Sequence, residues 1–144
     1  MMAEKIAIAS DHAGFELKTQ LKQELERLGF EPVDLGTDGP ASVDYPDFAL
    51  KMAETLKAGT VSRGVLVCGS GIGISMAANR HPQVRAALCH DHLTAKLARQ
   101  HNNANVLCLG GRTTGADVAR DCLQVFLGTE FEGGRHQNRV AKFS

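Results

Sequence analysis

Short apolar runs alternate with helix-patterned segments along the chain, and this alternation restricts the possible folds more than any other feature. The runs expected to form strands cover residues 5–9, 31–35, 64–68, 84–89 and 105–109. Apolar residues at helical spacing mark the segments 15–28, 46–58, 72–79, 92–101 and 115–127. Such strands and helices form βαβ units, whose right-handed crossovers cover both faces of a parallel sheet. We therefore predict an α/β fold, a doubly wound three-layer sandwich around a five-stranded parallel sheet.

The first helical segment is amphipathic, and its pattern assigns the two faces. Its apolar face carries Phe15, Leu17, Leu21, Leu25 and Leu28, whereas the other side is expected to expose Lys18, Lys22, Glu24 and Glu26. At the other end of the chain, residues 133–144 form a basic tail with few apolar side chains. This tail is expected to be a loose end or a basic arm on a partner subunit, with a short final helix.

Composition excludes several classes of partner. Neither a linker nor a tandem repeat divides the 144 residues, so we expect a single domain over residues 1–144. The sixteen basic and sixteen acidic residues cancel and aromatic residues make up only 5%, which disfavours nucleic acid as a partner. No apolar stretch approaches the ~20 residues of a membrane span, and the first residues lack the apolar core of a signal peptide. We therefore expect a cytoplasmic protein without a membrane partner.

A glycine-rich turn, Gly69-Ser70-Gly71-Ile72-Gly73, follows the strand expected at Gly64–Cys68 and leads into a helix. Backbone N–H groups at a helix N-terminus attract negative charge, and a thiol beside them favours its thiolate form. With Cys68 at its mouth, the turn combines an anion cradle with a candidate base, which points toward an enzyme. The turn does not match the dinucleotide fingerprint G-x-G-x-x-G and lacks the Lys-Ser/Thr of a P-loop, so nucleotide binding is the weaker interpretation.

Polar residues collect after the expected strands, where ligands bind in open parallel sheets. Asp11 and His12 follow the first strand, Tyr45 follows the second, and Arg112 follows the fifth. Structural alternatives remain open: Asp11 as a helix N-cap, and His12 as a surface residue. A guanidinium at the end of a strand indicates an anion as its partner, which makes Arg112 a candidate binding residue.

Other polar candidates lie away from these strand ends. His101 and Asn102 end the fourth helix, at the opposite edge of the subunit. Either they serve only the helix C-terminus, or a second subunit brings them to the site, which favours a dimer. Arg135 and Arg139 share a face if the tail is helical, with solvated surface charge as the alternative.

Metal-binding patterns are weak. The cysteines Cys68, Cys89, Cys108 and Cys122 form no CxxC pair, and all but Cys68 are interpreted as small buried hydrophobic residues. His90 and His92 lack a third ligand at zinc spacing. The sequence therefore predicts no metal site.

Five segments together resemble the type B ribose-5-phosphate isomerases, which belong with the allose- and galactose-6-phosphate isomerases. In order, they are residues 11–18 (DHAGFELK), 44–46 (DYP), 68–73 (CGSGIG), 99–102 (RQHN) and 133–139 (GGRHQNR). The match covers nearly the whole chain. Ser70 stands where many members carry Thr and keeps the hydroxyl. Some relatives instead use a Glu base and lack the cysteine, so the presence of Cys68 indicates the thiol branch.

The resemblance implies a Rossmann-like isomerase that interconverts ribose 5-phosphate and ribulose 5-phosphate through a cis-enediol(ate), without a metal or other cofactor. Cys68 would be the base, His101 the acid that opens the furanose ring, and Asp11 a residue that orients the sugar. The turn amides and the Ser70 hydroxyl would hold the enediolate oxygens. The implied substrate-binding residues are Asp11, His12, Tyr45, Gly69, Ser70, Gly71, Ile72, Gly73, Asn102, Arg112, Arg135 and Arg139. Family members share the site between the subunits of a homodimer, and some pair further into tetramers.

Two other functions remain as alternatives. A hexose-6-phosphate (allose or galactose) isomerase would need more room near residues 38–45, and the sequence does not size that pocket. A non-catalytic nucleotide- or flavin-binding module on the same fold would use the glycine turn. It would leave Cys68, His101 and the arginines of the tail without a role.

Overall fold

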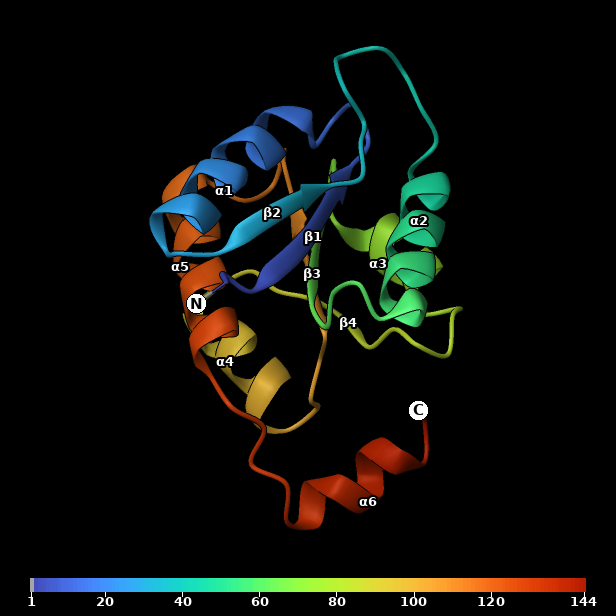
Figure 1. Ribbon diagram of the computed structural model, residues 1–144, viewed down its shortest axis with the longest axis vertical. Coiled ribbons are helices and arrows are strands. Elements are labelled where there is room, and N and C mark those ends of the chain that lie inside the picture. The colour runs from blue at the N-terminus through green and yellow to red at the C-terminus, as the bar shows by residue number, and fades with distance from the viewer. Residues whose placement is uncertain (1) are drawn as a thin grey trace.

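The computed structural model describes residues 2–144 and contains a parallel five-stranded sheet (Figure 1). Its strands are β1 (Lys5–Ser10), β2 (Glu31–Asp34), β3 (Gly64–Cys68), β4 (Ala86–Leu88) and β5 (Val106–Gly110). They are ordered β2-β1-β3-β5-β4, and every neighbouring pair is parallel. The predicted sheet is thereby confirmed.

Helices cover both faces of the sheet (Figure 1). They are α1 (Phe15–Arg27), α2 (Tyr45–Ala58), α3 (Ile72–Ala78), α4 (His92–Gln100), α5 (Ala116–Gly128) and α6 (Arg135–Ala141). One buried apolar cluster joins the sheet to α1, α4 and α5, and it includes Leu21 and Phe126. A second cluster, which includes Met52 and Ile74, joins the opposite face to α2 and α3. These two cores confirm the predicted three-layer sandwich.

Helix α1 differs from its predicted pattern, because two of its charged residues are buried. Lys18 is only 1% exposed and donates hydrogen bonds to Asp34 (2.7 Å) and to the carbonyl of Thr37 (2.6 Å). Glu24 is 5% exposed and accepts hydrogen bonds from Arg27 and from Gln124 of α5. Placing both on the solvent side was wrong. Each is buried because partners distant in the sequence or one turn away satisfy its charge.

The observed boundaries of the helices and strands lie within one residue of the predicted ones, with one exception. Strand β4 begins at Ala86, two residues later than the strand predicted over 84–89. The N–H of Val84 donates to the His81 carbonyl, and that of Arg85 donates to the Asn105 side chain (2.8 Å). These backbone groups are therefore satisfied outside the ladder between the strands, and regular pairing begins only after them.

Both edges of the sheet carry a residue that limits further pairing. At one edge, Pro32 lies within β2 and has no N–H to donate. At the other, the Asn79 side chain donates to the Ala86 carbonyl (2.9 Å) and accepts from the Ala86 N–H (2.8 Å). The Arg85 carbonyl and the Cys89 N–H both form hydrogen bonds with the β5 side. Because backbone groups alternate in direction along a strand, the N–H and carbonyl of Ala86 point away from β5, toward the open edge of the sheet.

The basic tail ends in α6, which confirms the short final helix and lies apart from the other helices (Figure 1). An extended stretch after α5 leads to it. Across residues 2–144, none of the helices has both the length and the apolar character that crossing a membrane requires.

Candidate active site

A cleft of about 580 Å³ opens where β1, β3 and β5 end. Strands β2 and β3 lie on opposite sides of β1, so the cleft is at the switch in strand order, where open α/β sheets bind ligands. Its lining residues are Asp11, His12, Ala13, Tyr45, Cys68, Gly69, Ser70, Ile72, Gly73, Arg112 and Thr113. Most of the predicted binding residues are therefore brought together in one subunit.

Cys68 ends β3 and lines this cleft, although the residue is only 4% exposed. Its Sγ accepts the N–H of Gly71 at 3.2 Å. Gly71 has a φ of +78°, and a Cβ there would lie 2.5 Å from Leu88 Cδ1 and 2.9 Å from the carbonyl carbon of Leu109. Glycine is thus required at this position, and the turn it permits holds the sulfur against a main-chain amide.

The other three cysteines are buried outside the cleft, as predicted for Cys89, Cys108 and Cys122. Burial raises the pKa of Cys89 to about 12 and that of Cys122 to about 11, and it also raises the pKa of Cys108. These thiols stay protonated near neutral pH and are unsuited to proton abstraction. Cys68 is distinguished from them by its place beside the glycine turn.

Asp11 and His12 form the β1 side of the cleft. Asp11 is not the N-cap of α1, which is Gly14, but its Oδ1 accepts the Gly14 N–H (3.0 Å) and closes the turn before the helix. The N–H of Val43 donates to His12 Nδ1 (3.2 Å). A neutral His12 therefore carries its hydrogen on Nε2 and has a donor free for an anion.

Tyr45 and Arg112 approach the glycine turn from two sides. A Cβ on Gly73 would lie 2.6 Å from Cζ of Tyr45, so the ring rests directly on that glycine. The backbone N–H of Arg112 donates to the Gly69 carbonyl (2.9 Å). The guanidinium of Arg112 lies against the same glycine, with Nη1 3.4 Å from where a Gly69 Cβ would be. The cleft thus combines a thiol, a carboxylate, an imidazole and a guanidinium around exposed main chain.

Five predicted site residues do not line this cleft: Gly71, His101, Asn102, Arg135 and Arg139. Gly71 lies directly behind the lining, where its N–H donates to Cys68 Sγ. Asn102 lines a separate hollow of about 420 Å³ beside β4, together with Phe143 near the end of the chain. Arg135 lines a third hollow with Glu132 and His136. One subunit therefore does not assemble the whole predicted site.

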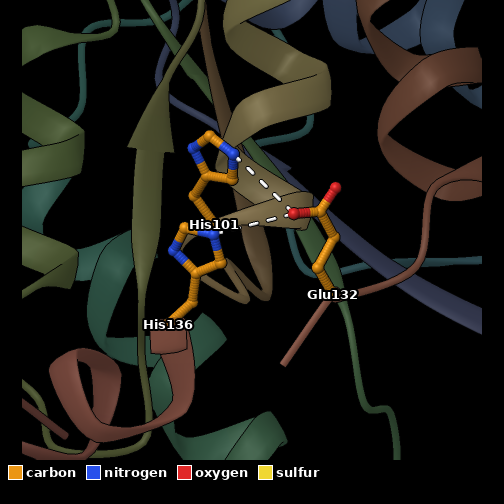
Figure 2. Close-up of side chains that lie close together, drawn as sticks. All are labelled: His101, Glu132 and His136. Carbon is orange, nitrogen blue, oxygen red and sulfur yellow. Dashed lines mark ion pairs between the residues drawn. The ribbon is translucent and has the colours of Figure 1, made fainter. Parts of the chain in front are cut away.

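His101, Glu132 and His136 lie together at the end of α4 (Figure 2). The two imidazole rings stack with centroids 4.3 Å apart and an angle of 15° between their planes. Glu132 Oε1 lies 3.9 Å from Nε2 of His101 and 3.6 Å from Nε2 of His136. Burial lowers the pKa of His136, and the charges of His101 and Arg135 lower it further.

The donor atoms of these three residues all lie within 4.8 Å of one another, close enough for a metal ion. Nearly parallel rings, however, direct their in-plane lone pairs side by side and not toward one point. We therefore assign no metal to this cluster.

Three residues near the candidate sites were not predicted. Ala13 and Thr113 line the cleft, and each adjoins a predicted residue in the sequence, which was an available signal. Glu132 approaches His101 only because the stretch after α5 returns to α4, where its N–H donates to the Gln100 carbonyl (3.0 Å). An acidic residue in a connecting segment gives no sequence signal of such a contact.

Comparison with known proteins gives matches along nearly the whole chain. A family model described as Ribose/Galactose Isomerase matches residues 6–143. Ribose-5-phosphate isomerase B of Escherichia coli is 43% identical over 136 residues, which cover 94% of this chain and 91% of that protein. The solved structure of Trypanosoma brucei type B ribose 5-phosphate isomerase is 48% identical with a TM-score of 0.95, covering 99% of this chain and 97% of that one. A Thermotoga maritima ribose 5-phosphate isomerase structure is 50% identical, with a TM-score of 0.95 and 97% of each chain covered.

Proposed function

The chain belongs to the Ribose/Galactose Isomerase family and is an isomerase, and from this premise we propose that it interconverts ribose 5-phosphate and ribulose 5-phosphate. The observation that carries the proposal is the Cys68 thiol, which shares one cleft with Asp11, His12 and Arg112. Moving a proton between C2 and C1 requires a base, donors for the enediolate oxygens and an anchor for the phosphate. The cleft offers side chains or main chain for each.

Cys68 is the proposed base. Its thiolate takes the proton from C2 of the open-chain aldose, which leaves an enediolate with its charge on O1. The hydroxyl proton passes from O2 to O1, and the resulting thiol returns its proton to C1 as C2=O forms. The Gly71 N–H, 3.2 Å from Sγ, favours negative charge on the sulfur.

The enediolate oxygens need other donors, because the N–H of Gly71 faces the sulfur and that of Ile72 donates to Ser70 Oγ (3.1 Å). Within residues 2–144, the amides of Gly69, Ser70 and Gly73 donate to no other residue. We assign the enediolate to these three amides, assisted by the Ser70 hydroxyl. Each well-placed donor stabilises the transition state by roughly 2.7–4 kcal/mol.

The phosphate anchor combines His12 and Arg112 of one subunit with Arg135 and Arg139 of another. His12 offers Nε2–H because Val43 occupies its Nδ1. Arginine suits a phosphate because its planar fork binds two oxygens at once. Asp11 and Tyr45 then contact the sugar between the two ends of the cleft, and Asn102 of the second subunit binds it from the other side.

A homodimer is therefore part of the proposal, with pairing into a tetramer left open. The residues that a subunit keeps outside its own cleft lie at the end of α4 and on the separate α6 (Figure 1). Beside the cleft, α3 exposes two large apolar side chains, Ile72 (52% exposed) and Met76 (68% exposed). A second copy that covered them would bury apolar surface and bring its own His101 toward the cleft.

Two broader features also remain proposals. We propose a reducing cytoplasm as the compartment, because none of the four cysteines is in a disulfide. We also propose that residues 1–144 act as one domain, since the cleft draws on β1, β3 and β5 together with the start of α2.

The test begins with a coupled assay on ribose 5-phosphate. Cys68→Ala is expected to lower kcat by about 100-fold or more, because a positioned base contributes roughly 10²–10⁴-fold. Cys122→Ala, which removes a buried thiol outside the cleft, is the matched control. Wild-type turnover is expected to be the same with and without a chelator. Near-normal turnover by Cys68→Ala would reject the base, and faster conversion of allose 6-phosphate would reject the pentose substrate.

The same experiment extends to the shared site. Cys68→Ala and His101→Asn subunits, each inactive alone, are co-expressed so that mixed dimers form. In a mixed dimer one site receives Cys68 from one subunit and His101 from the other, and its second site has neither. Random pairing makes half of the dimers mixed, so about one quarter of wild-type activity is expected to return. No recovery in mixed dimers would mean that each subunit builds its own site.

A further inference from the structure

Glu132 has no part in the function proposed above, yet its carboxylate lies 3.9 Å from Nε2 of His101 (Figure 2). We propose that Glu132 is a positioning residue for His101, which it orients as the acid that opens the sugar ring. The inference rests on the proposed function, because it assigns a partner to the acid of that same reaction.

The backbone ties Glu132 to His101. The Glu132 N–H donates to the carbonyl of Gln100, the residue before His101 (3.0 Å). Arg99 adds a second link: its Nη1 donates to the Ala104 carbonyl (2.6 Å) and its Nε donates to the Thr129 carbonyl (3.1 Å). The segment 129–132 and the loop after α4 are therefore held together, which keeps the carboxylate of Glu132 beside the imidazole of His101.

The distances point to electrostatic orientation. At 3.9 Å from His101 and 3.6 Å from His136, Glu132 Oε1 is too far away for a direct hydrogen bond but within the range of an ion pair. A carboxylate facing Nε2 favours the tautomer that carries its hydrogen there, as the aspartate does in a Ser-His-Asp triad. Nδ1 of His101 is then the nitrogen that exchanges a proton with the sugar.

The ring-opening step follows from that assignment. The reactive form of His101 is the imidazolium, which carries a hydrogen on each ring nitrogen. The electron pair of the C1–O4 bond moves to O4, which takes the proton from Nδ1 of His101. The anomeric O1–H gives its proton to water as C1=O forms. His101 is left neutral with its hydrogen on Nε2, the nitrogen that faces Glu132.

His136 supports the geometry without competing for the proton. It is 8% exposed, stacks on His101, and is near Arg135 and Arg139, both of which oppose a positive charge on it. His101 is more accessible, with 38% of its side chain exposed. Of the two rings that the carboxylate faces, His101 is therefore the one able to reach a substrate.

The test compares kcat in the two directions. Ribose 5-phosphate must open its ring, whereas ribulose 5-phosphate is open-chain because its O5 is esterified. The overall equilibrium fixes the ratio of kcat/KM in the two directions, so kcat is the diagnostic quantity. Glu132→Gln is expected to lower kcat from ribose 5-phosphate about 10-fold, a fraction of what a general acid contributes, and to leave kcat from ribulose 5-phosphate within two-fold. Glu132→Asp, which keeps the charge, is expected to recover part of the loss.

Glu130→Gln is the matched control, because it removes the same charge from the same exposed segment. Equal kcat losses in both directions would indicate a merely structural role and overturn the proposal, as would a Glu132→Gln enzyme that behaves like Glu130→Gln. A wild-type protein that leaves ribose 5-phosphate unconverted would instead refute the proposed function itself.

Discussion

Replacing Gly71 by alanine tests how tightly the turn beside Cys68 is packed. Two effects are expected to lower the free energy of unfolding. The left-handed φ of +78° costs a residue with a Cβ roughly 1–2 kcal/mol. The new methyl group would also lie 2.5 Å from Leu88 Cδ1 and 2.9–3.0 Å from the carbonyl of Leu109. Overpacking of this kind costs typically 1–3 kcal/mol, so the total loss is about 2–5 kcal/mol.

Gly59 provides the matched control, because it separates the two effects. Its φ is +80°, nearly that of Gly71, but nothing lies within 4 Å of where its Cβ would be. Gly59→Ala is therefore expected to cost only the conformational part, about 1–2 kcal/mol. The difference between the two variants measures the steric part alone.

The assay is equilibrium unfolding in urea. The free energy of unfolding of each variant is compared with that of the wild type, using the same dependence on urea concentration (m-value) for all three proteins. Gly71→Ala is expected to lose about 1–3 kcal/mol more than Gly59→Ala. It is also expected to lose isomerase activity, because relief of the clash moves the N–H of residue 71 away from Cys68 Sγ. Equal destabilisation of the two variants would refute the reasoning, since the turn would then relax without cost.

Two further predictions concern the buried charges of α1. Lys18→Met is expected to lower the free energy of unfolding by about 2–3 kcal/mol in urea, because it leaves the Thr37 carbonyl without its donor. Lys22→Met, which removes a half-exposed lysine from the same Asp34, is expected to cost under about 1 kcal/mol, and similar losses for both would contradict this account. The hydrogen bond from Arg27 lowers the pKa of Glu24 from 4.5 to about 2. The ionised Glu24 carboxylate therefore stabilises the folded state fully above about pH 4.5, and this stabilisation is lost as the pH falls toward 2. Between pH 6 and pH 2.5, the free energy of unfolding should therefore fall less steeply with pH for Glu24→Gln than for the wild type. The same pH dependence in both proteins would contradict a stabilising role for the Glu24 carboxylate.

The features that the sequence predicts well are those settled within short segments. All five residues of β3 are buried, so an apolar run alone indicates the central strand. Cys68 and Gly71 are three residues apart, and their contact follows from the turn between them. The cleft is similarly predictable, because its residues directly follow strands whose parallel arrangement brings their ends together.

The features that the sequence did not predict depend on partners far along the chain. The α1 pattern places Lys18 toward solvent, and only the return of the chain through Asp34 and Thr37 explains its burial. Strand β4 begins late because Asn105, 20 residues beyond Arg85, accepts the Arg85 N–H. Glu132 reaches His101 by the path of the tail, which no local pattern encodes.

The residues at the two margins of the sheet have a consequence for how copies of this protein can associate. Pro32 removes one backbone donor, and Asn79 already occupies both groups of Ala86, so an incoming chain finds few partners for its own main chain. Continuous β-structure running from molecule to molecule is thereby disfavoured. Concentrated solutions of the folded protein should resist fibril growth, and contacts between copies must form through side chains on helices and loops.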